Sequence, residues 1–314
     1  MRIIREPGKS GNVLATIAIG ENYLKPFLEY ALHTWQMYAE RHDLGIIVFD
    51  EDLIPRDHPK WKKANWQKFI IPRQIMQAGL AVGDVCHLDT DILINPSAPN
   101  VFAGHDSSKI AVVSQRTGLP YPLQLVLRRI AFYRNRFFSE RYPLDSGLFA
   151  SLEQVYAYSN LPIQPDYACS GVFVFNPARH ADLFQSYFDE FDVSVITPTS
   201  GGEELHFNYL VQSLGLAEWV DYRFQALWMY EMAWNYPFLY TLDRKDDELV
   251  RRCIEASLST NYFLHFAGSW YESDMWSQVK VLTDHEVLDR WERFAEYLER
   301  PVTGKFVGPV KPMQ

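Results

Sequence analysis

Apolar and polar positions in the first ninety residues follow a pattern that predicts strands separated by helices. Residues 13–19, 46–49 and 85–88 are short apolar runs of the kind found in buried strands. Between them, residues 23–41 carry apolar side chains every three or four positions, and residues 66–77 also look helical. This order predicts a parallel sheet with helices on its faces, in which ligands bind at the carboxyl ends of the strands.

The remaining chain gives fewer clear signals. Residues 167–175 and 261–267 have strand patterns, residues 201–214 open a helical pattern, and residues 281–298 predict an amphipathic helix. Residues 301–314 contain three prolines and two glycines, which is typical of a mobile tail. We therefore expect a single α/β domain followed by this tail.

Two aspartates follow the third predicted strand. Asp89 and Asp91 are two positions apart, so in an extended chain their side chains point the same way. Two like charges in a half-buried setting repel unless a cation or a proton is shared between them. The sequence thus indicates an Mg²⁺ or Mn²⁺ ion that also binds a substrate diphosphate. A second such pair, Asp50 and Asp52, opens a polar loop, where solvated carboxylates are ordinary.

Composition narrows the choice of partners. A net charge of −9 with a pI near 5.5 disfavours nucleic acid as the main partner. The cysteines, Cys86, Cys169 and Cys253, lie far apart in apolar runs, which predicts buried thiols and a cytoplasmic protein. The first ten residues hold no apolar segment, and no run approaches about 18 apolar residues. We expect neither secretion nor membrane spanning, while peripheral membrane contact stays open.

One stretch is strongly basic. Residues 116–141 carry a single acid, Glu140, and interleave aromatic side chains with six arginines: Arg116, Arg128, Arg129, Arg134, Arg136 and Arg141. Either a solvated helix face above core aromatics or a contact surface for an anionic acceptor or a membrane headgroup would account for this composition. On the second interpretation, the stretch should border the acceptor side of a cleft.

Several stretches, in the same order, resemble the metal-dependent glycosyltransferases of the GT-A fold, most closely the glycogenin-like family 8. The resemblance covers roughly residues 12–270. It implies one GT-A type domain over residues 1–300, with a mostly parallel central sheet and helices on both faces. Residues 12–105 would form a Rossmann-like nucleotide-binding half, and residues 106–300 the sugar and acceptor half. The matching segments are Ala-Ile-Gly-Glu-Asn-Tyr ending at Tyr23, Trp-Gln-Lys ending at Lys68, His-Leu-Asp-Thr-Asp-Ile-Leu-Ile around Asp89, Cys-Ser-Gly-Val-Phe-Val-Phe-Asn from Cys169, Gly-Gly-Glu-Glu ending at Glu204, and His-Phe-Ala-Gly from His265.

The resemblance implies a role for single residues. Tyr23 matches an aromatic that stacks on uracil, and Lys68 a basic residue near the diphosphate. His265 resembles a third metal ligand beside Asp89 and Asp91, a mixed shell that favours Mn²⁺ over Mg²⁺. The same segments give the further nucleotide contacts, Ile19, Thr90 and Gly268, and the donor-sugar contacts, Ser170, Gly171 and Gly202.

The chain also departs from the family pattern. Cys169 stands where the family usually has Asn, and Glu203 and Glu204 stand where it has Asp-Gln. We expect these two glutamates to be the catalytic residues of a transferase that moves a sugar from a UDP-sugar to a glycan, lipid-linked or protein acceptor. Retention is the expected outcome. The alternatives are an inverting enzyme with Glu203 or Glu204 as base, a haloacid-dehalogenase-type phosphatase, and a non-catalytic nucleotide- or sugar-binding protein.

Overall fold

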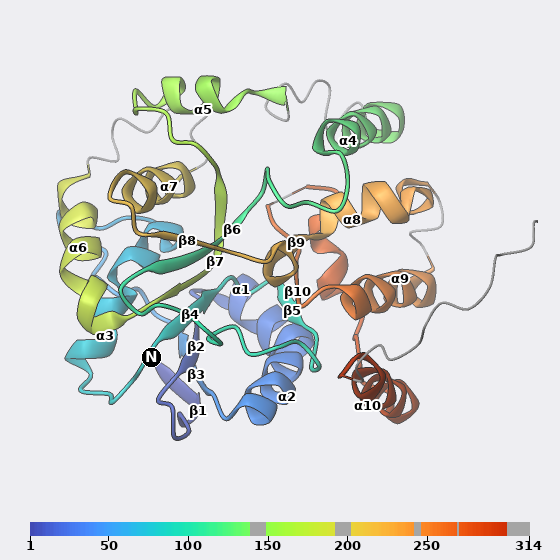
Figure 1. The fold of residues 1–314 in the computed structure, drawn as a ribbon, viewed down its shortest axis with the longest axis horizontal. Coiled ribbons are helices and arrows are strands. Elements are labelled where there is room, and N and C mark those ends of the chain that lie inside the picture. The colour runs from blue at the N-terminus through green and yellow to red at the C-terminus, as the bar shows by residue number, and fades with distance from the viewer. Residues whose placement is uncertain (139–148, 192–201, 242–245, 269, 300–314) are drawn as a thin grey trace, which may run out of the picture. The chain divides into compact units, whose positions relative to one another are not determined.

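The computed structural model describes residues 1–138, 149–191, 202–241, 246–268 and 270–299 (Figure 1). The chain divides into two compact units, Met1–Val281 and Leu282–Gln314. The predicted tail at 301–314 lies outside the described residues. In the second unit the described element is α10 (His285–Glu299), which agrees with the helix predicted at 281–298. The expectation of a single domain over 1–300 stays a prediction.

The first ninety residues form the predicted parallel core of the sheet. Strand β2 (Val13–Ile17) pairs in parallel with both β3 (Gly45–Phe49) and β4 (Val85–Leu88). The first connecting helix is not uniform: α1 (Glu21–Pro26) passes into a π-helical turn (Phe27–Ala31) before α2 (Leu32–His42). Pro26 lacks the amide hydrogen that a regular helix needs, so a wider turn follows it. The second connection is a 3₁₀ segment (Ala64–Ile70) leading into α3 (Ile71–Gln77).

The complete large sheet is mixed. Its seven strands among the described residues have the order β1-β3-β2-β4-β7-β6-β8. Strands β6 (Ile110–Ser114) and β8 (Ala217–Val220) run in the same direction as β2, β3 and β4, whereas β1 (Arg2–Arg5) and β7 (Ala168–Phe175) oppose them. A mostly parallel sheet is therefore found, with an antiparallel strand inserted beside β4. This insertion places residues 168–171 next to the carboxyl end of β4.

A small second sheet completes the arrangement around that strand end. Strand β10 (Phe263–His265) pairs antiparallel with β5 (Ile92–Ile94) and parallel with β9 (Ala226–Leu227). His265 is opposite Ile92 in this register. The strand predicted at 261–267 is thus present, although it is only three residues long. Its pairing with β5 brings the end of the first unit back to the predicted metal motif.

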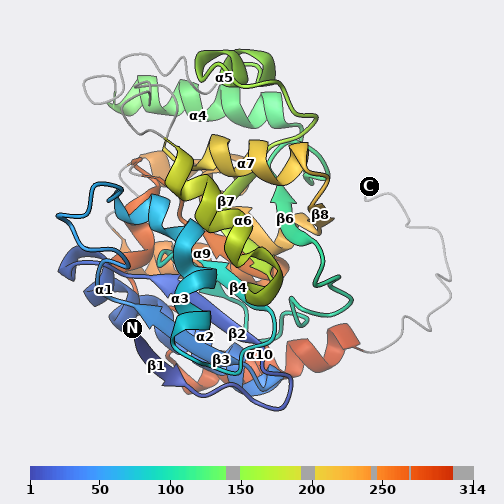
Figure 2. The ribbon, with the colours of Figure 1, turned by 90° about the vertical axis from the view of Figure 1, so that its left-hand side faces the viewer.

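Helices cover both faces of the large sheet (Figures 1 and 2). On one face α3, α6 (Pro177–Glu190) and α7 (Glu204–Ser213) bury an aromatic core that includes Phe173, Phe184 and Phe207. On the other face lie α2 and the small sheet. The remaining helices of the first unit are α4 (Leu123–Phe138), α5 (Leu152–Tyr158), α8 (Trp228–Asn235) and α9 (Asp247–Thr260).

The structure bears on the state of the cysteines and on membrane spanning. Cys86, Cys169 and Cys253 are buried and unpaired, as expected for reduced thiols. In the described part of the chain, every helix is too short or too polar to cross a bilayer. Cytoplasmic location stays a prediction.

Candidate active site

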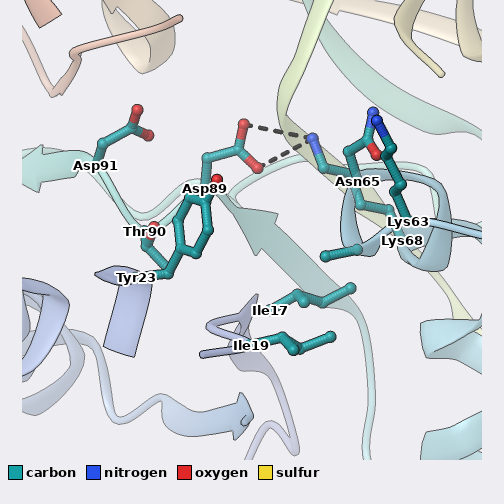
Figure 3. A pocket seen from close by; sticks show the side chains of 10 residues that line it. Ile17, Ile19, Tyr23, Lys63, Asn65, Lys68, Asp89, Thr90 and Asp91 are labelled. Atoms are coloured by element: carbon teal, nitrogen blue, oxygen red, sulfur yellow. Dashed lines mark hydrogen bonds and ion pairs between the residues drawn. The ribbon is translucent and has the colours of Figure 1, made fainter. Parts of the chain in front are cut away.

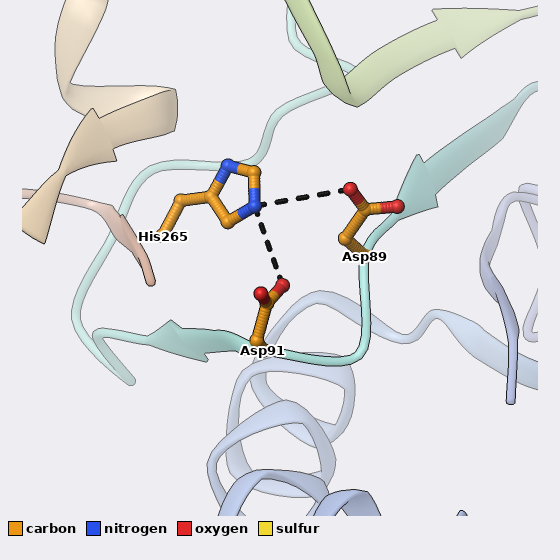
Figure 4. Close-up of side chains that lie close together, drawn as sticks. All are labelled: Asp89, Asp91 and His265. Carbon is orange, nitrogen blue, oxygen red and sulfur yellow. Dashed lines mark ion pairs between the residues drawn. The ribbon is translucent and has the colours of Figure 1, made fainter. Parts of the chain in front are cut away.

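Two aspartates and a histidine meet where β4, β5 and β10 come together (Figure 4). Asp89 follows β4, and its amide donates to the carbonyl of Gly171 on β7. Asp91 precedes β5, and its carbonyl accepts from the amide of Phe266. Nε2 of His265 lies 3.3 Å from Oδ1 of Asp91 and 3.8 Å from Oδ2 of Asp89. The three side chains each offer one ligand atom within 4.8 Å of the others, which is close enough to share one cation.

The chemistry of this donor set fits a divalent ion. Oδ1 of Asp91 is buried and, among the described residues, has Nε2 of His265 at 3.3 Å but no well-formed hydrogen bond, which is costly for an ionised carboxylate. Burial lowers the pKa of His265, but the charges of Asp91 and Asp89 outweigh burial and raise it overall. The cluster therefore favours an added positive charge. Two carboxylates and one imidazole are suitable ligands for Mn²⁺, and less so for Mg²⁺, which prefers oxygen alone.

Gly171 allows His265 to reach the aspartates. A Cβ atom at this position would lie 2.3 Å from Cε1 of His265 and 2.8 Å from Nδ1. The ring thus packs directly on the backbone of β7, which only glycine permits. The sequence prediction gave Gly171 a donor-sugar contact, which stays a prediction; the structure places Gly171 against the ring of His265.

Gln225, which the sequence prediction did not include, is the partner of the other ring nitrogen. Its Nε2 lies 3.2 Å from Nδ1 of His265, while its Oε1 is buried without a hydrogen bond. Exchanging the amide oxygen and nitrogen turns Oε1 toward the ring, so that it accepts from Nδ1–H. In that arrangement Nε2 of His265 keeps its lone pair for a metal.

Lys68 lies between the metal ligands and the first of the two glutamates. The side chain is buried, and its Nζ lies 3.0 Å from Oδ1 of Asp89 and 2.9 Å from Oε1 of Glu203. Burial alone would lower the pKa of Lys68, but these two carboxylates raise it above its ordinary value. Burial likewise favours neutral Asp89, yet Lys68 and His87 hold the pKa of Asp89 well below its usual range. Lys68 is therefore a permanent cation at this site.

His87 is a second residue that the sequence prediction missed. It is fully buried, and Nε2 lies 3.2 Å from Oδ1 of Asp89. Burial lowers the pKa of His87, and the hydrogen bond to Asp89 compensates only in part, so the ring is neutral and donates to the carboxylate. The period of two along β4 could have revealed it, because His87 and Asp89 share one face of the strand.

The two adjacent glutamates have different surroundings. Glu203 is buried at the start of α7, where Oε1 accepts from the hydroxyl of Ser170 at 2.8 Å and Oε2 accepts from the amide of Asn65. Gly202, at a φ of 98°, leaves the space that Asn65 occupies. Glu204 turns instead to Tyr167, and burial raises its pKa. The structure thus links Glu203 to Asp89 through Lys68, while Glu204 hydrogen-bonds Cys169, whose Sγ lies 3.8 Å from Nδ1 of His265.

Two cavities meet at the metal cluster. The first, of about 300 Å³, has Ile17 and Ile19 in its lining together with Lys68 and Asp89 (Figure 3). The second, of about 330 Å³, is lined by Gly268 and by residues of the segment 270–277. Three residues line both cavities: Tyr23, Thr90 and Asp91. Tyr23 is 60% exposed, so its ring is available to a ligand.

The second aspartate pair and the basic stretch lie apart from this cluster in the sequence. Asp50 pairs with Arg2, and Asp52 accepts from Arg56 and Gln67, so this second aspartate pair is held by local cations and amides. Part of the basic stretch at 116–141 forms α4, and its residues 139–141 lie outside the described residues. Neither interpretation of the basic stretch applies to Arg134, because this residue is buried in an ion pair with Glu272 at 2.9 Å.

No family model matches the chain, and no curated protein matches its sequence. Solved structures that align with the chain include a glycosyltransferase involved in the glycosylation of the major capsid of PBCV-1, at 8% identity and a TM-score of 0.46, covering 85% of this chain and 98% of the other. The galactosyltransferase LgtC, solved in complex with donor and acceptor sugar analogues, aligns at 12% identity and a TM-score of 0.44, covering 92% and 97%. The glycosyltransferase GlyE of Streptococcus pneumoniae aligns at 11% identity and a TM-score of 0.41, covering 94% and 66%. These structures are glycosyltransferases, the class that the sequence motifs resemble.

Proposed function

We propose that the protein is a metal-dependent glycosyltransferase that moves a sugar from a UDP-sugar to an acceptor hydroxyl. One observation carries this proposal: Asp89, Asp91 and His265 offer ligand atoms close enough to share one cation, and of these Asp89 and Asp91 line the first cavity while Asp91 also lines the second. A donor nucleotide and an acceptor must occupy adjacent spaces on either side of the bond that is exchanged. A cation held by these residues would bind the diphosphate that links the nucleoside to the sugar in the donor.

Asp89, Asp91 and His265 would hold the divalent ion. When bound, such an ion neutralises the diphosphate and stabilises the negative charge that develops on the leaving group. His87 fixes the carboxylate of Asp89 by donating from Nε2, and Gln225 fixes the ring of His265. These contacts hold two of the ligands in place before substrate arrives, which reduces the cost of ordering them.

The first cavity suits the nucleoside. Its lining combines the exposed ring of Tyr23 with the aliphatic side chains of Ile17 and Ile19. An aromatic face can stack on a base, and aliphatic side chains exclude water from the opposite side. Thr90, between the two aspartates, lines the same cavity and adds a hydroxyl beside the expected diphosphate.

Lys68 adds a fixed positive charge beside the diphosphate. It is already held by Asp89 and Glu203, so it needs no rearrangement to act. A preorganised cation in a site shielded from water stabilises developing negative charge more effectively than a solvated one. We therefore assign Lys68 to stabilisation of the departing nucleoside diphosphate.

We further propose that the anomeric configuration is retained. An inverting transferase needs a carboxylate that is free to take the proton of the acceptor hydroxyl. Both oxygens of Glu203 are occupied, one by Lys68 and Ser170 and the other by Asn65. Glu204 is hydrogen-bonded to Tyr167 and Cys169, so its carboxylate also has partners, and burial raises its pKa. In the proposed mechanism Glu203 positions the donor sugar and does not act as base.

Calorimetry tests the cation site directly. UDP should bind in the presence of Mn²⁺ and lose most of its affinity when EDTA is added. Asp91→Asn should abolish the metal-dependent part of the affinity while leaving the fold intact, because it removes a ligand charge. Asp50→Asn is the matched control, since it alters the other aspartate pair and should bind as the wild type does.

A donor screen tests the reaction itself. Slow Mn²⁺-dependent hydrolysis of one UDP-sugar is expected, and proton NMR at early times should show the anomer that the donor carried. Metal-independent UDP binding, or wild-type binding by Asp91→Asn, would overturn the assignment. Release of the opposite anomer would leave the transferase class intact and refute retention.

A further inference from the structure

The outward face of α4 carries two large apolar side chains set among arginines. Leu125 is 47% exposed and Phe132 62% exposed, and Arg128, Arg129 and Arg136 are exposed beside them. Spacings of three and four residues place all five on one side of the helix, here named the α4 face. Both ribbon views show α4 at the edge of the first unit (Figures 1 and 2).

The opposite side of α4 is fixed, so the helix cannot rotate to bury this face. Val126 and Ile130 are fully buried. Arg134 is 1% exposed, pairs with the buried carboxylate of Glu272 and lies 4.4 Å from the ring centre of Trp270. Breaking a buried ion pair leaves an uncompensated charge, so the orientation of α4 is strongly held. The exposure of Phe132 is a property of the folded protein.

The charge of the α4 face is local and opposite to that of the whole chain. Residues 116–138 contain no aspartate or glutamate, whereas the full sequence has a net charge of −9. Among the described residues, no ion pair includes Arg128 or Arg136. Arg129 is held by Trp234, whose carbonyl accepts from its guanidinium. Uncompensated arginines on an acidic protein mark a surface that attracts an anionic partner.

We propose that the α4 face docks onto a lipid bilayer that contains anionic phospholipids. Phe132 lies between Arg128 and Arg136, and Leu125 lies one turn before Arg128 on the same side of the helix. In this arrangement apolar side chains reach the acyl boundary while guanidinium groups pair with headgroup phosphates. A nucleic acid or an acidic polysaccharide would pair with the arginines but would leave the two apolar side chains in water. The combination of both features selects the bilayer.

This docking would have a consequence for the second cavity. Trp270 lines that cavity and also stacks on Arg134 from the inner side of α4. The membrane-binding helix and the cavity wall are thus joined by direct contacts. The inference about the bilayer does not depend on the proposed function, because it concerns binding alone.

Vesicle flotation of the full-length chain tests the proposal. Binding is expected to vesicles of phosphatidylcholine mixed with phosphatidylglycerol, to be absent with phosphatidylcholine alone, and to weaken at high salt. The double variant Arg128→Glu, Arg136→Glu should lower the partition coefficient by more than about 20-fold, since each arginine near an anionic surface contributes on the order of fivefold. Phe132→Ser keeps the charge and should weaken binding several-fold.

The control variant is Lys9→Glu, Arg179→Glu, which changes the net charge by the same amount at exposed positions outside α4. It should bind vesicles nearly as the wild type does. Circular dichroism confirms that each variant is folded. Equal binding to both vesicle types, equal loss in the control variant, or binding to soluble dextran sulfate without vesicle binding would each overturn the proposal. UDP binding is measured on the same samples, so that a failed bilayer inference is distinguished from a failed active-site assignment.

Discussion

Adding a single methyl group at Gly171 should displace the metal ligand from the site. The Cβ of Gly171→Ala would lie 2.3 Å from Cε1 of His265, whereas carbon atoms in contact are about 3.5 Å apart. The ring must therefore move by about 1 Å or turn. Its backbone cannot follow easily, because His265 is paired with both Ile92 and Leu227. Turning the ring carries Nε2 away from Asp91.

The size of the effect follows from two separate costs. Forcing an extra carbon into a packed interior destabilises a protein by about 1–3 kcal/mol. Disturbing the support of a metal ligand lowers metal affinity by about 10–100-fold, or about 1.4–2.7 kcal/mol. Because His265 itself is displaced, we expect a loss of Mn²⁺ affinity at or above the upper end of that range.

Calorimetric titration with Mn²⁺ and urea denaturation measure the two costs independently. Gly45→Ala is the matched control, since its Cβ would lie 2.7 Å from a side-chain carbon of Val13 in the same sheet and touches no ligand. It should lose stability while keeping its Mn²⁺ affinity. Wild-type Mn²⁺ affinity in folded Gly171→Ala would refute the role of His265 as a ligand.

Three further predictions concern buried polar groups. Gln225→Leu should lower Mn²⁺ affinity about tenfold or more, because leucine cannot accept a hydrogen bond from His265. Gln225→Glu should retain the affinity, because glutamate still accepts that hydrogen bond, and calorimetric titration with Mn²⁺ distinguishes the two variants. Glu272→Leu should cost about 3–5 kcal/mol in urea denaturation, and adding Arg134→Met should recover much of this, because no buried charge is then unpaired; equal stability of the single and double variants would contradict this. Burial raises the pKa of Glu231 above its ordinary value of 4.5 in the folded protein. The folded state therefore holds this proton more tightly than the unfolded state, and the free energy of unfolding falls as pH rises from 4.5 through the folded pKa. Glu231→Gln should therefore gain stability relative to wild type at pH 8 compared with pH 4, and a difference independent of pH would argue against it.

Local patterns determined the fold of the first ninety residues. The apolar runs at 13–19, 46–49 and 85–88 predicted three parallel strands, and the structure contains them as β2, β3 and β4. A buried strand needs consecutive apolar residues, and the order of apolar and polar residues can be read directly from the sequence. The same reasoning placed Asp89 and Asp91 at a strand end, where they lie close to His265.

Only the tertiary structure decided which distant residues join that site. The insertion of β7 beside β4 brings Ser170 and Gly171 to Asp89, and the pairing of β10 with β5 brings His265 to Asp91. Sequence spacing carries no direct record of such pairings, because they depend on strand order and register. The resemblance to a family anticipated His265 but not the contact of its ring with Gly171.

The same limit applies to charge. Among the arginines of α4, sequence alone treats Arg134 and Arg136 alike, since both lie in one basic stretch. The structure buries Arg134 against Glu272 and leaves Arg136 exposed, because the two positions fall on opposite sides of the helix. Helical period predicts that the two sides differ, but only the packing of α4 against its neighbours determines which side is buried.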